Sequence, residues 1–308
     1  MCWPTTTRTL LTSINNMGFL LQAQGKLAEA EPYWREALEG SRRVLGNEHR
    51  NTLTSIGNVG FLLQAQGRLA EAEPYYREAL EGSRRVLGNE HRITLTSINN
   101  MGFLLQAQGR LDEAEPYYRE ALAGRRRVLG DDHPDTLQSI NNMGFLLQSQ
   151  GRLADAEPYC REALEGKRRV LGDEHPETLI SKSNLALLLV ELGNASEAER
   201  LAGEAVEGAR ATLGPEHWFN GNFLGKHGRA LAALERLSEA ESALLESHRI
   251  LAAALSLDHD QTTRVVGYLA DLYDAWGKPE LAAKWRAKVP TEQDAVAPDP
   301  PADERQDE

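Results

Sequence analysis

Cysteine is nearly absent from this chain, which has only Cys2 and Cys160 among its 308 residues. Two cysteines cannot form a disulfide framework of the kind that stabilises small secreted domains. The N-terminal residues MCWPTTTRTLL also lack the basic region, apolar stretch and small-residue cleavage site of a signal peptide. We therefore expect a protein of the reducing cytoplasm.

Long apolar runs are missing as well. No stretch reaches the roughly 18 consecutive apolar residues that a membrane-spanning helix needs. The hydrophobic content of 41% is nevertheless sufficient for a packed core. We therefore expect a soluble protein with no membrane partner.

The sequence patterns of common catalytic sites do not occur. No Gly-Lys pair is followed by Ser or Thr, as a phosphate-binding loop requires, and no HExxH, CxxC, GxSxG or HRD pattern is found. We expect no enzymatic activity, and no catalytic residue, cofactor or metal.

Acidic residues outnumber basic ones, so the net charge of the chain is −12. Residues 291–308 contain seven acidic residues and one Arg, so this tail carries −6 and the rest of the chain the other −6. Nucleic acid binding favours a basic body, so we expect no nucleic acid partner. Pro298, Pro300 and Pro301, together with the small number of apolar residues, predict a disordered acidic tail over 290–308.

What the chain does have is an internal repeat of 42 residues. Residues 51–92 and 93–134 are identical at 33 of 42 positions. After a lead-in over 1–8, the array is predicted to fill 9–289, with units near 9–50, 51–92, 93–134, 135–176, 177–218, 219–260 and a cap over 261–289. Repetition at this period predicts a solenoid, in which each unit buries its apolar face against its neighbours.

Each unit is expected to contain two helices. The first ends at a Gly suited to a left-handed C-cap, such as Gly25 or Gly67. Capping boxes at Ser196 and Ser238 predict the start of the second helix, and Pro32 then falls at the edge of its first turn. A glycine recurs within the second helix, and it predicts either a bend or a close helix contact.

Two sequence motifs resemble the tetratricopeptide repeat, and specifically the 42-residue repeats of kinesin light chains and their bacterial relatives. The motifs are NNMGFLLxxQGRLxEAEPYYREAL and RRVLGxxHP. The resemblance implies an all-α, right-handed α-solenoid whose first helices form the inner, concave wall. Arg50 and Arg92 replace the usual proline, and no heptad coil precedes the array. Cargo transport is therefore not inferred.

Two faces can be distinguished on each first helix. Leu11, Ile14 and Leu21 share the face expected to pack on the second helix. The other face carries amides and phenylalanines that could bind the backbone and side chains of an extended peptide. These candidate groove residues are Asn15, Asn16, Phe19, Gln22, Asn58, Phe61, Gln64, Asn99, Asn100, Phe103, Gln106, Asn141, Asn142, Phe145, Gln148 and Asn184.

A structural interpretation competes with the groove. The asparagines could fix neighbouring helices to one another, and the phenylalanines could be inter-repeat core. Further along, Lys226 and Arg229 replace this lining, where they could bind an acidic ligand end or the acidic tail, or form a solvated face.

Histidines and aromatic residues recur or cluster in ways that need an interpretation. His49 and its counterparts at the 42-residue step lie on the order of 10 Å apart in stacked layers, too far to share a metal. We predict that each ends the inter-repeat loop before a first helix. The aromatic residues after 215, such as Trp218 and Trp285, predict a terminal cap, with an aromatic binding site as the alternative.

Together these features predict a non-catalytic scaffold that binds a peptide or protein segment in the groove. One alternative is a regulatory or substrate-recruiting arm of a larger bacterial signalling protein with a kinase or nucleotide-binding switch. The other is end-to-end self-association through an uncapped first repeat.

Overall fold

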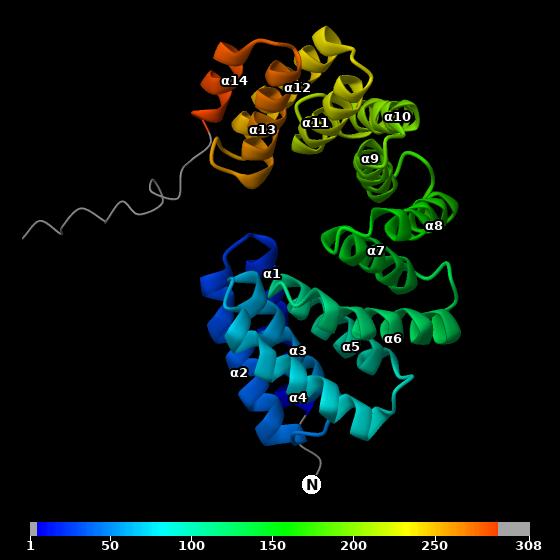
Figure 1. Ribbon diagram of the computed structural model, residues 1–308. Coiled ribbons are helices and arrows are strands. Elements are labelled where there is room, and N and C mark those ends of the chain that lie inside the picture. Colours follow the sequence, from blue (N-terminus) through cyan, green and yellow to red (C-terminus); the bar gives the residue numbers. More distant parts are fainter. Residues whose placement is uncertain (1–4, 289–308) are drawn as a thin grey trace, which may run out of the picture. The chain divides into compact units, whose positions relative to one another are not determined.

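The computed structural model describes residues 5–288, which contain fourteen α-helices and no strand. The chain forms two compact units, divided after Val170. Unit 1 contains helices α1 to α8 and unit 2 contains α9 to α14 (Figure 1). Residues 1–4 of the predicted lead-in and the predicted tail over 290–308 lie outside the described residues.

Helical hairpins follow one another at the predicted step. The first helices of the hairpins are α1 (Thr5–Ala23), α3 (Arg50–Ala65), α5 (Arg92–Ala107), α7 (Pro134–Ser149), α9 (Pro176–Glu191), α11 (Trp218–Ala233) and α13 (Asp260–Ala275). The second helices are α2 (Leu27–Leu45), α4 (Leu69–Leu87), α6 (Leu111–Leu129), α8 (Leu153–Leu171), α10 (Ala195–Leu213), α12 (Leu237–Ala254) and α14 (Pro279–Arg286). The predicted all-α solenoid of helical hairpins is confirmed.

Histidine starts the first helix of each hairpin from α3 onward. His91, for example, is the N-cap of α5, and its Nδ1 accepts a hydrogen bond from the backbone N–H of Ile93 at 3.2 Å. This bond satisfies one of the N–H groups that a helix N-terminus leaves without a partner. The same arrangement occurs at His49, His133, His175, His217 and His259. The prediction that these histidines end the inter-repeat loops is confirmed.

The turn that joins the two helices of a hairpin has the predicted glycine, but the second helix starts earlier than predicted. Gly25 has a positive φ of 75°, as predicted for the cap, and the N–H of Lys26 donates to the Leu21 carbonyl at 2.9 Å. This turn lets the second helix start two residues after the glycine. Helices α10 and α12 therefore begin before Ser196 and Ser238, and the predicted capping boxes are wrong. Pro32 accordingly lies inside α2, beyond its first turn.

The glycine within each second helix marks a close helix contact. A Cβ added to Gly82 in α4 would lie 2.4 Å from Cδ2 of Leu53 in α3. Gly124 is in the same relation to Leu95, at 2.3 Å. The close contact, rather than a bend, explains why glycine is required there.

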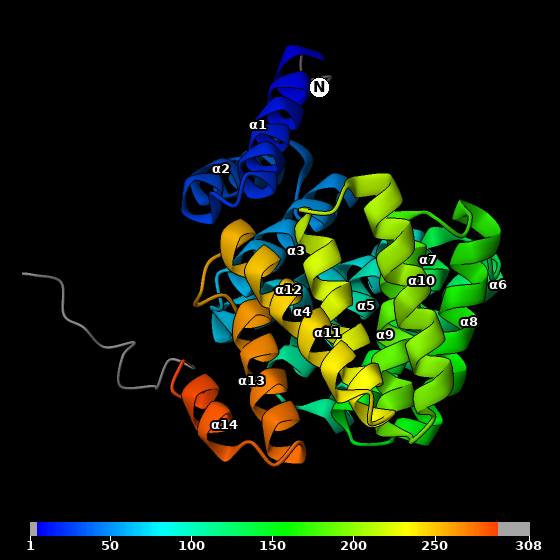
Figure 2. The same ribbon diagram turned by 90° about the horizontal axis from the view of Figure 1, so that it is seen from above.

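Unit 2 has a core rich in aromatic side chains. Phe223 and Tyr273 are buried in it, and Trp218, Trp276 and Trp285 pack against it. Successive helices of this unit lie side by side (Figure 2). The aromatic residues after 215 thus contribute to packing, as a terminal cap requires.

Among residues 5–288, no helix combines the length and the apolar character needed to cross a bilayer.

Candidate functional site

Four phenylalanines occupy the same position on the first helices of unit 1. Their exposed fractions are 42% for Phe19, 36% for Phe61, 46% for Phe103 and 39% for Phe145. We call these four residues the Phe row. Rings with this exposure are not inter-repeat core, although the helix period makes them resemble core residues in the sequence. An aromatic ring left in water at every repeat is a feature that packing does not require.

The predicted glutamines hold the two helices of a hairpin together. Gln64 is 9% exposed, and its Oε1 accepts a hydrogen bond from the Tyr76 hydroxyl at 3.0 Å. Its Nε2 donates to the carbonyl of Phe103 in the next repeat at 3.4 Å. Gln106 is bonded in the same way to Tyr118, at 2.9 Å. These amides serve the fold and position the Phe row, and Gln64 is too buried to meet a ligand.

Cys160 takes the place that Tyr118 has in the preceding repeat. Its thiol accepts a hydrogen bond from Nε2 of Gln148 at 3.4 Å, where the second and third repeats have a tyrosine hydroxyl. Burial raises the pKa of this thiol to about 11. The thiol is therefore protonated near neutral pH and is a poor nucleophile.

Some of the predicted asparagines form hydrogen bonds with an asparagine of a neighbouring repeat, and others do not. Nδ2 of Asn58 donates to Oδ1 of Asn15 at 3.1 Å, and Asn142 donates to Asn99 at the same distance. Gly57 takes the corresponding place in the second repeat, so Asn100 lacks this partner. The alternative in which asparagines join neighbouring repeats is therefore supported at Asn58 and Asn142. Asn16 is exposed, and Asn141 is half-buried.

On the corresponding face of unit 2, the basic residues Lys226 and Arg229 both have partners and do not form a solvated patch. Lys226 is 8% exposed and donates from Nζ to Oδ1 of Asn184 at 2.6 Å. Burial and, to a smaller extent, the positive charge of Arg264 together lower the pKa of Lys226 to about 8. Arg229 lies over the ring of Tyr268 and pairs with Asp271 at 3.4 Å.

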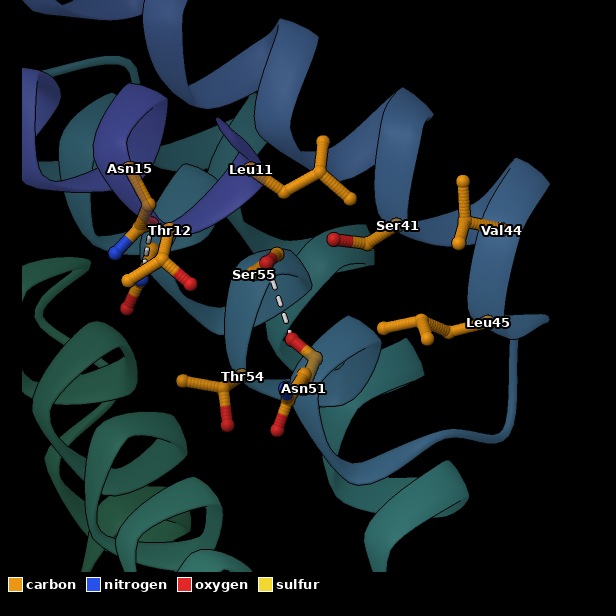
Figure 3. A pocket seen from close by; sticks show the side chains of 10 residues that line it. Leu11, Thr12, Asn15, Ser41, Val44, Leu45, Asn51, Thr54 and Ser55 are labelled. Atoms are coloured by element: carbon orange, nitrogen blue, oxygen red, sulfur yellow. Dashed lines mark hydrogen bonds between the residues drawn. The ribbon is translucent and has the colours of Figure 1, made fainter. Parts of the chain in front are cut away.

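A polar cavity that the sequence did not indicate lies between α1, α2 and α3. Its volume is about 160 Å³. Figure 3 shows Leu11 and Ser41 pointing toward one another, with Asn51 and Ser55 on the opposite side. The residue at the position of Ser41 is Ser83 in the second repeat and Arg125 in the third. Because Ser83 repeats the same side chain, the sequence gives no signal that marks this cavity.

Within the described range 5–288, no group of three or more His, Cys, Asp or Glu side chains is placed to hold a metal ion.

The profile of the tetratricopeptide repeat family matches residues 9–85, 55–123, 93–146 and 137–211, which together cover more than half of the chain. No curated protein sequence matches the chain. The nearly identical TPR-like repeats of a kinesin light chain-like protein from Podosopora anserina are 25% identical, with a TM-score of 0.61 over 68% of this chain and 99% of that one.

Two further structures share the fold at lower identity. BtubC (BKLC) from P. vanneervenii is 21% identical, with a TM-score of 0.62 over 75% of this chain and 91% of that one. The Rap conjugation gene regulator of plasmid pLS20, in complex with the Phr* peptide, is 16% identical, with a TM-score of 0.59 over 88% of this chain and 72% of that one. The chain belongs to the tetratricopeptide repeat family, and its repeats are of the kinesin light chain-like type.

Proposed function

We propose that the protein is a non-catalytic interaction scaffold that binds an extended segment of a partner protein along the Phe row of unit 1. The observation that carries this proposal is the exposure of the same aromatic ring in four successive repeats, between 36% and 46%. Aromatic side chains supply much of the binding energy at protein interfaces because they bury a large area at small entropic cost.

The side chains beneath the row support a binding role. Phe19 contacts the buried Trp34 edge-on, with ring centroids 5.0 Å apart. The hydrogen bonds of Gln64 and Gln106 tie the helices that carry Phe61 and Phe103 to the tyrosines of the second helices. The rings are thus presented from a rigid base, which lowers the entropy lost on binding.

The comparison with the Rap regulator supports the class of ligand. That protein binds the Phr* peptide and shares its fold with this chain, although the 16% identity extends the likeness no further than the fold. The alternative prediction, a regulatory arm of a larger signalling protein, is consistent with one fold likeness. The Signal Transduction ATPase with Numerous Domains with a tetratricopeptide repeat sensor from Pyrococcus horikoshii matches 90% of this chain with 41% of its own length, at 15% identity and a TM-score of 0.68.

The proposal is tested by affinity capture with the full chain as bait and two double variants. Phe61→Ala with Phe103→Ala removes two rings of the row, and we expect it to lose the partner that the wild type retains. Val86→Ala with Val128→Ala is the matched control, because both valines are 42% exposed on second helices. It is expected to retain the partner.

Circular dichroism checks that both variants keep their helix content. A partner that survives loss of both phenylalanines, or that is lost equally from both double variants, would show that the Phe row is not the binding surface.

A second candidate function, self-association, rests on the outer face of α1. Leu10, Met17 and Leu20 are 58%, 41% and 53% exposed. The residues at the same positions of α5, namely Thr94, Met101 and Leu104, are 0%, 3% and 0% exposed because the preceding hairpin covers them. We propose that a second copy of the chain covers this face.

Light scattering over a hundredfold range of concentration tests the self-association. The wild type should increase in mass with concentration, and Leu20→Glu should remain at the mass of a single chain. A wild type of constant single-chain mass would exclude this function.

A further inference from the structure

The cavity between α1, α2 and α3 has a counterpart two repeats later, where the protein fills the same place itself. Arg125 in α6 occupies the position that Ser41 has in α2, and it is 5% exposed. Its Nη1 donates to the backbone carbonyl of Asp135 and to the Ser139 hydroxyl, both at 2.8 Å. Asn51 and Ser55 hold the same two positions in the cavity.

The residues that surround the cavity match those that surround the Arg125 side chain. We call the surroundings of Arg125 the filled interface. In the cavity, Asn58 donates to Asn15 at 3.1 Å, and in the filled interface Asn142 donates to Asn99 at 3.1 Å. Leu11 in the cavity corresponds to Leu95 in the filled interface. The guanidinium group of Arg125 therefore shows that a site with these surrounding residues can accommodate a guanidinium group.

The hydrogen bonds of one cavity side chain, Ser55, differ from those of its counterpart in the filled interface. The Ser55 hydroxyl donates to the carbonyl of Asn51 at 3.0 Å. In the filled interface Ser139 instead donates to Oδ1 of Asn99 at 3.4 Å and accepts from Arg125. Ser55 can make the same change, which would free the Asn51 carbonyl for a donor.

Ser41 adds a hydrogen-bond acceptor to the cavity. It is 5% exposed and lines the cavity, and Figure 3 shows no hydrogen bond between its hydroxyl and the other residues drawn. The hydroxyl oxygen of Ser41 can accept a hydrogen bond from a ligand with N–H donors.

We propose that this cavity binds the guanidinium group of an arginine side chain in the partner segment. The inference rests on the proposed scaffold function, because Thr12 and Asn15 line the cavity from the same face of α1 that carries Phe19. Guanidinium suits the cavity better than ammonium because it is planar, less strongly hydrated and offers several donors in a fixed geometry.

Charge decides how tightly the group is held. Arg125 faces the carboxylate of Asp135, which opposes the lowering of the Arg125 pKa by burial. The cavity has the neutral Asn51 at that position. The wild-type cavity should therefore bind an isolated arginine group weakly, in the millimolar range. Asn51→Asp restores the carboxylate and should bind at least about fivefold more tightly.

The experiment titrates the full chain, labelled with ¹⁵N at asparagine, with Nα-acetylarginine amide and follows the side-chain amides of Asn15 and Asn58 by NMR. A saturable shift is expected with the arginine compound and a much smaller one with Nα-acetylcitrulline amide, which is neutral. Ser41→Arg places the chain's own guanidinium in the cavity and should abolish the shift. Equal shifts with citrulline, or an unchanged titration of Ser41→Arg, would overturn the proposal.

A second variant tests the internal comparison. Arg125→Ser empties the filled interface and should create a new site, reported by Asn99 and Asn142, that binds more tightly than the cavity because Asp135 is present. Absence of a saturable shift there, in a folded variant, would contradict the assignment. The Phe61→Ala, Phe103→Ala variant separates this inference from the scaffold function, since it should lose the protein partner and still bind the arginine compound.

Discussion

The two units present the same face of the first helix in different ways. In unit 1 the position of the Phe row is aromatic in all four repeats, whereas unit 2 has Leu187, Arg229 and Asp271 there. Inside the hairpins, the core of unit 1 repeats the same aliphatic residues around one buried ring in each of its first three hairpins, Trp34, Tyr76 and Tyr118, whereas unit 2 has aromatic residues at varied positions. Since a solenoid hairpin folds with either surface, the exposed rings of unit 1 are not explained by packing.

The largest expected effect comes from removing the aromatic support that only unit 1 has. Tyr118 is fully buried, whereas unit 2 has Ala202 and Leu244 at this position. Tyr118→Ala leaves a cavity and deprives Gln106 of its partner, so unfolding should become easier by about 3–5 kcal/mol. Urea denaturation measures the change, and a loss below about 1 kcal/mol would show that the support is dispensable.

The next effect concerns a buried lysine that only unit 2 has. Lys182 stands where unit 1 has Ile98 and Ile140, and its Nζ pairs with Asp173 at 3.0 Å and Glu204 at 3.2 Å. Lys182→Ala should destabilise unit 2 by about 2–3 kcal/mol, through the lost side-chain volume and the loss of the two ion pairs of Lys182. Lys182→Ile, which copies unit 1, should recover most of this loss in thermal unfolding. An Ile variant no more stable than the Ala variant would contradict the comparison.

A smaller effect distinguishes two repeats of unit 1. Asn142 is bonded to Asn99, whereas Asn100 faces Gly57 and has no side-chain partner there. Asn142→Ala should cost about 1 kcal/mol of folding free energy, and Asn100→Ala almost nothing. Chemical denaturation of the two variants in parallel checks this, and equal losses would mean that the inter-repeat bond contributes no stability.

The smallest effect is a pH dependence confined to unit 2. Burial lowers the pKa of His227, an effect that the nearby carboxylate of Glu199 opposes, and unit 1 has Met101 or Met143 at this position. Because the unfolded chain binds the proton more readily, the contribution of His227 is complete above pH 6.5 and is lost as the pH falls below it.

His227→Met should therefore reduce the slope of stability against pH between pH 7 and pH 5.5, as measured by thermal unfolding. An unchanged slope would assign the pH dependence to other groups, such as His248, whose pKa burial also lowers.

The sequence predicted the helices well because a 42-residue repeat with a glycine such as Gly25 at each turn leaves few alternatives. It misplaced the starts of α10 and α12, since Ser196 and Ser238 fit a capping box locally. The turn is instead closed by backbone bonds, such as that from Asn194 N–H to the Leu189 carbonyl at 2.8 Å. Backbone hydrogen bonds of this kind require no particular side chain, so no residue pattern in the sequence indicates them.

The candidate site was predicted less completely. Phe61 and Gln64 lie on one face of α3, and the helical period does not tell which of the two side chains the next repeat covers. The structure exposes the phenylalanine and buries the glutamine. The cavity beside Ser41 could not be predicted, because it depends on how two neighbouring hairpins meet. The second repeat has the same side chain at this position, Ser83, so the residue type alone does not mark the cavity.

Photo-crosslinking in cells tests the central claim most directly. A photoreactive phenylalanine analogue is placed at residue 103 in one variant and at residue 128, equally accessible on a second helix, in the other. The account predicts that residue 103 crosslinks to a partner polypeptide and that residue 128 does not. Crosslinking of the same partner only from residue 128, or equally from both, would contradict the assignment of the Phe row as the binding surface.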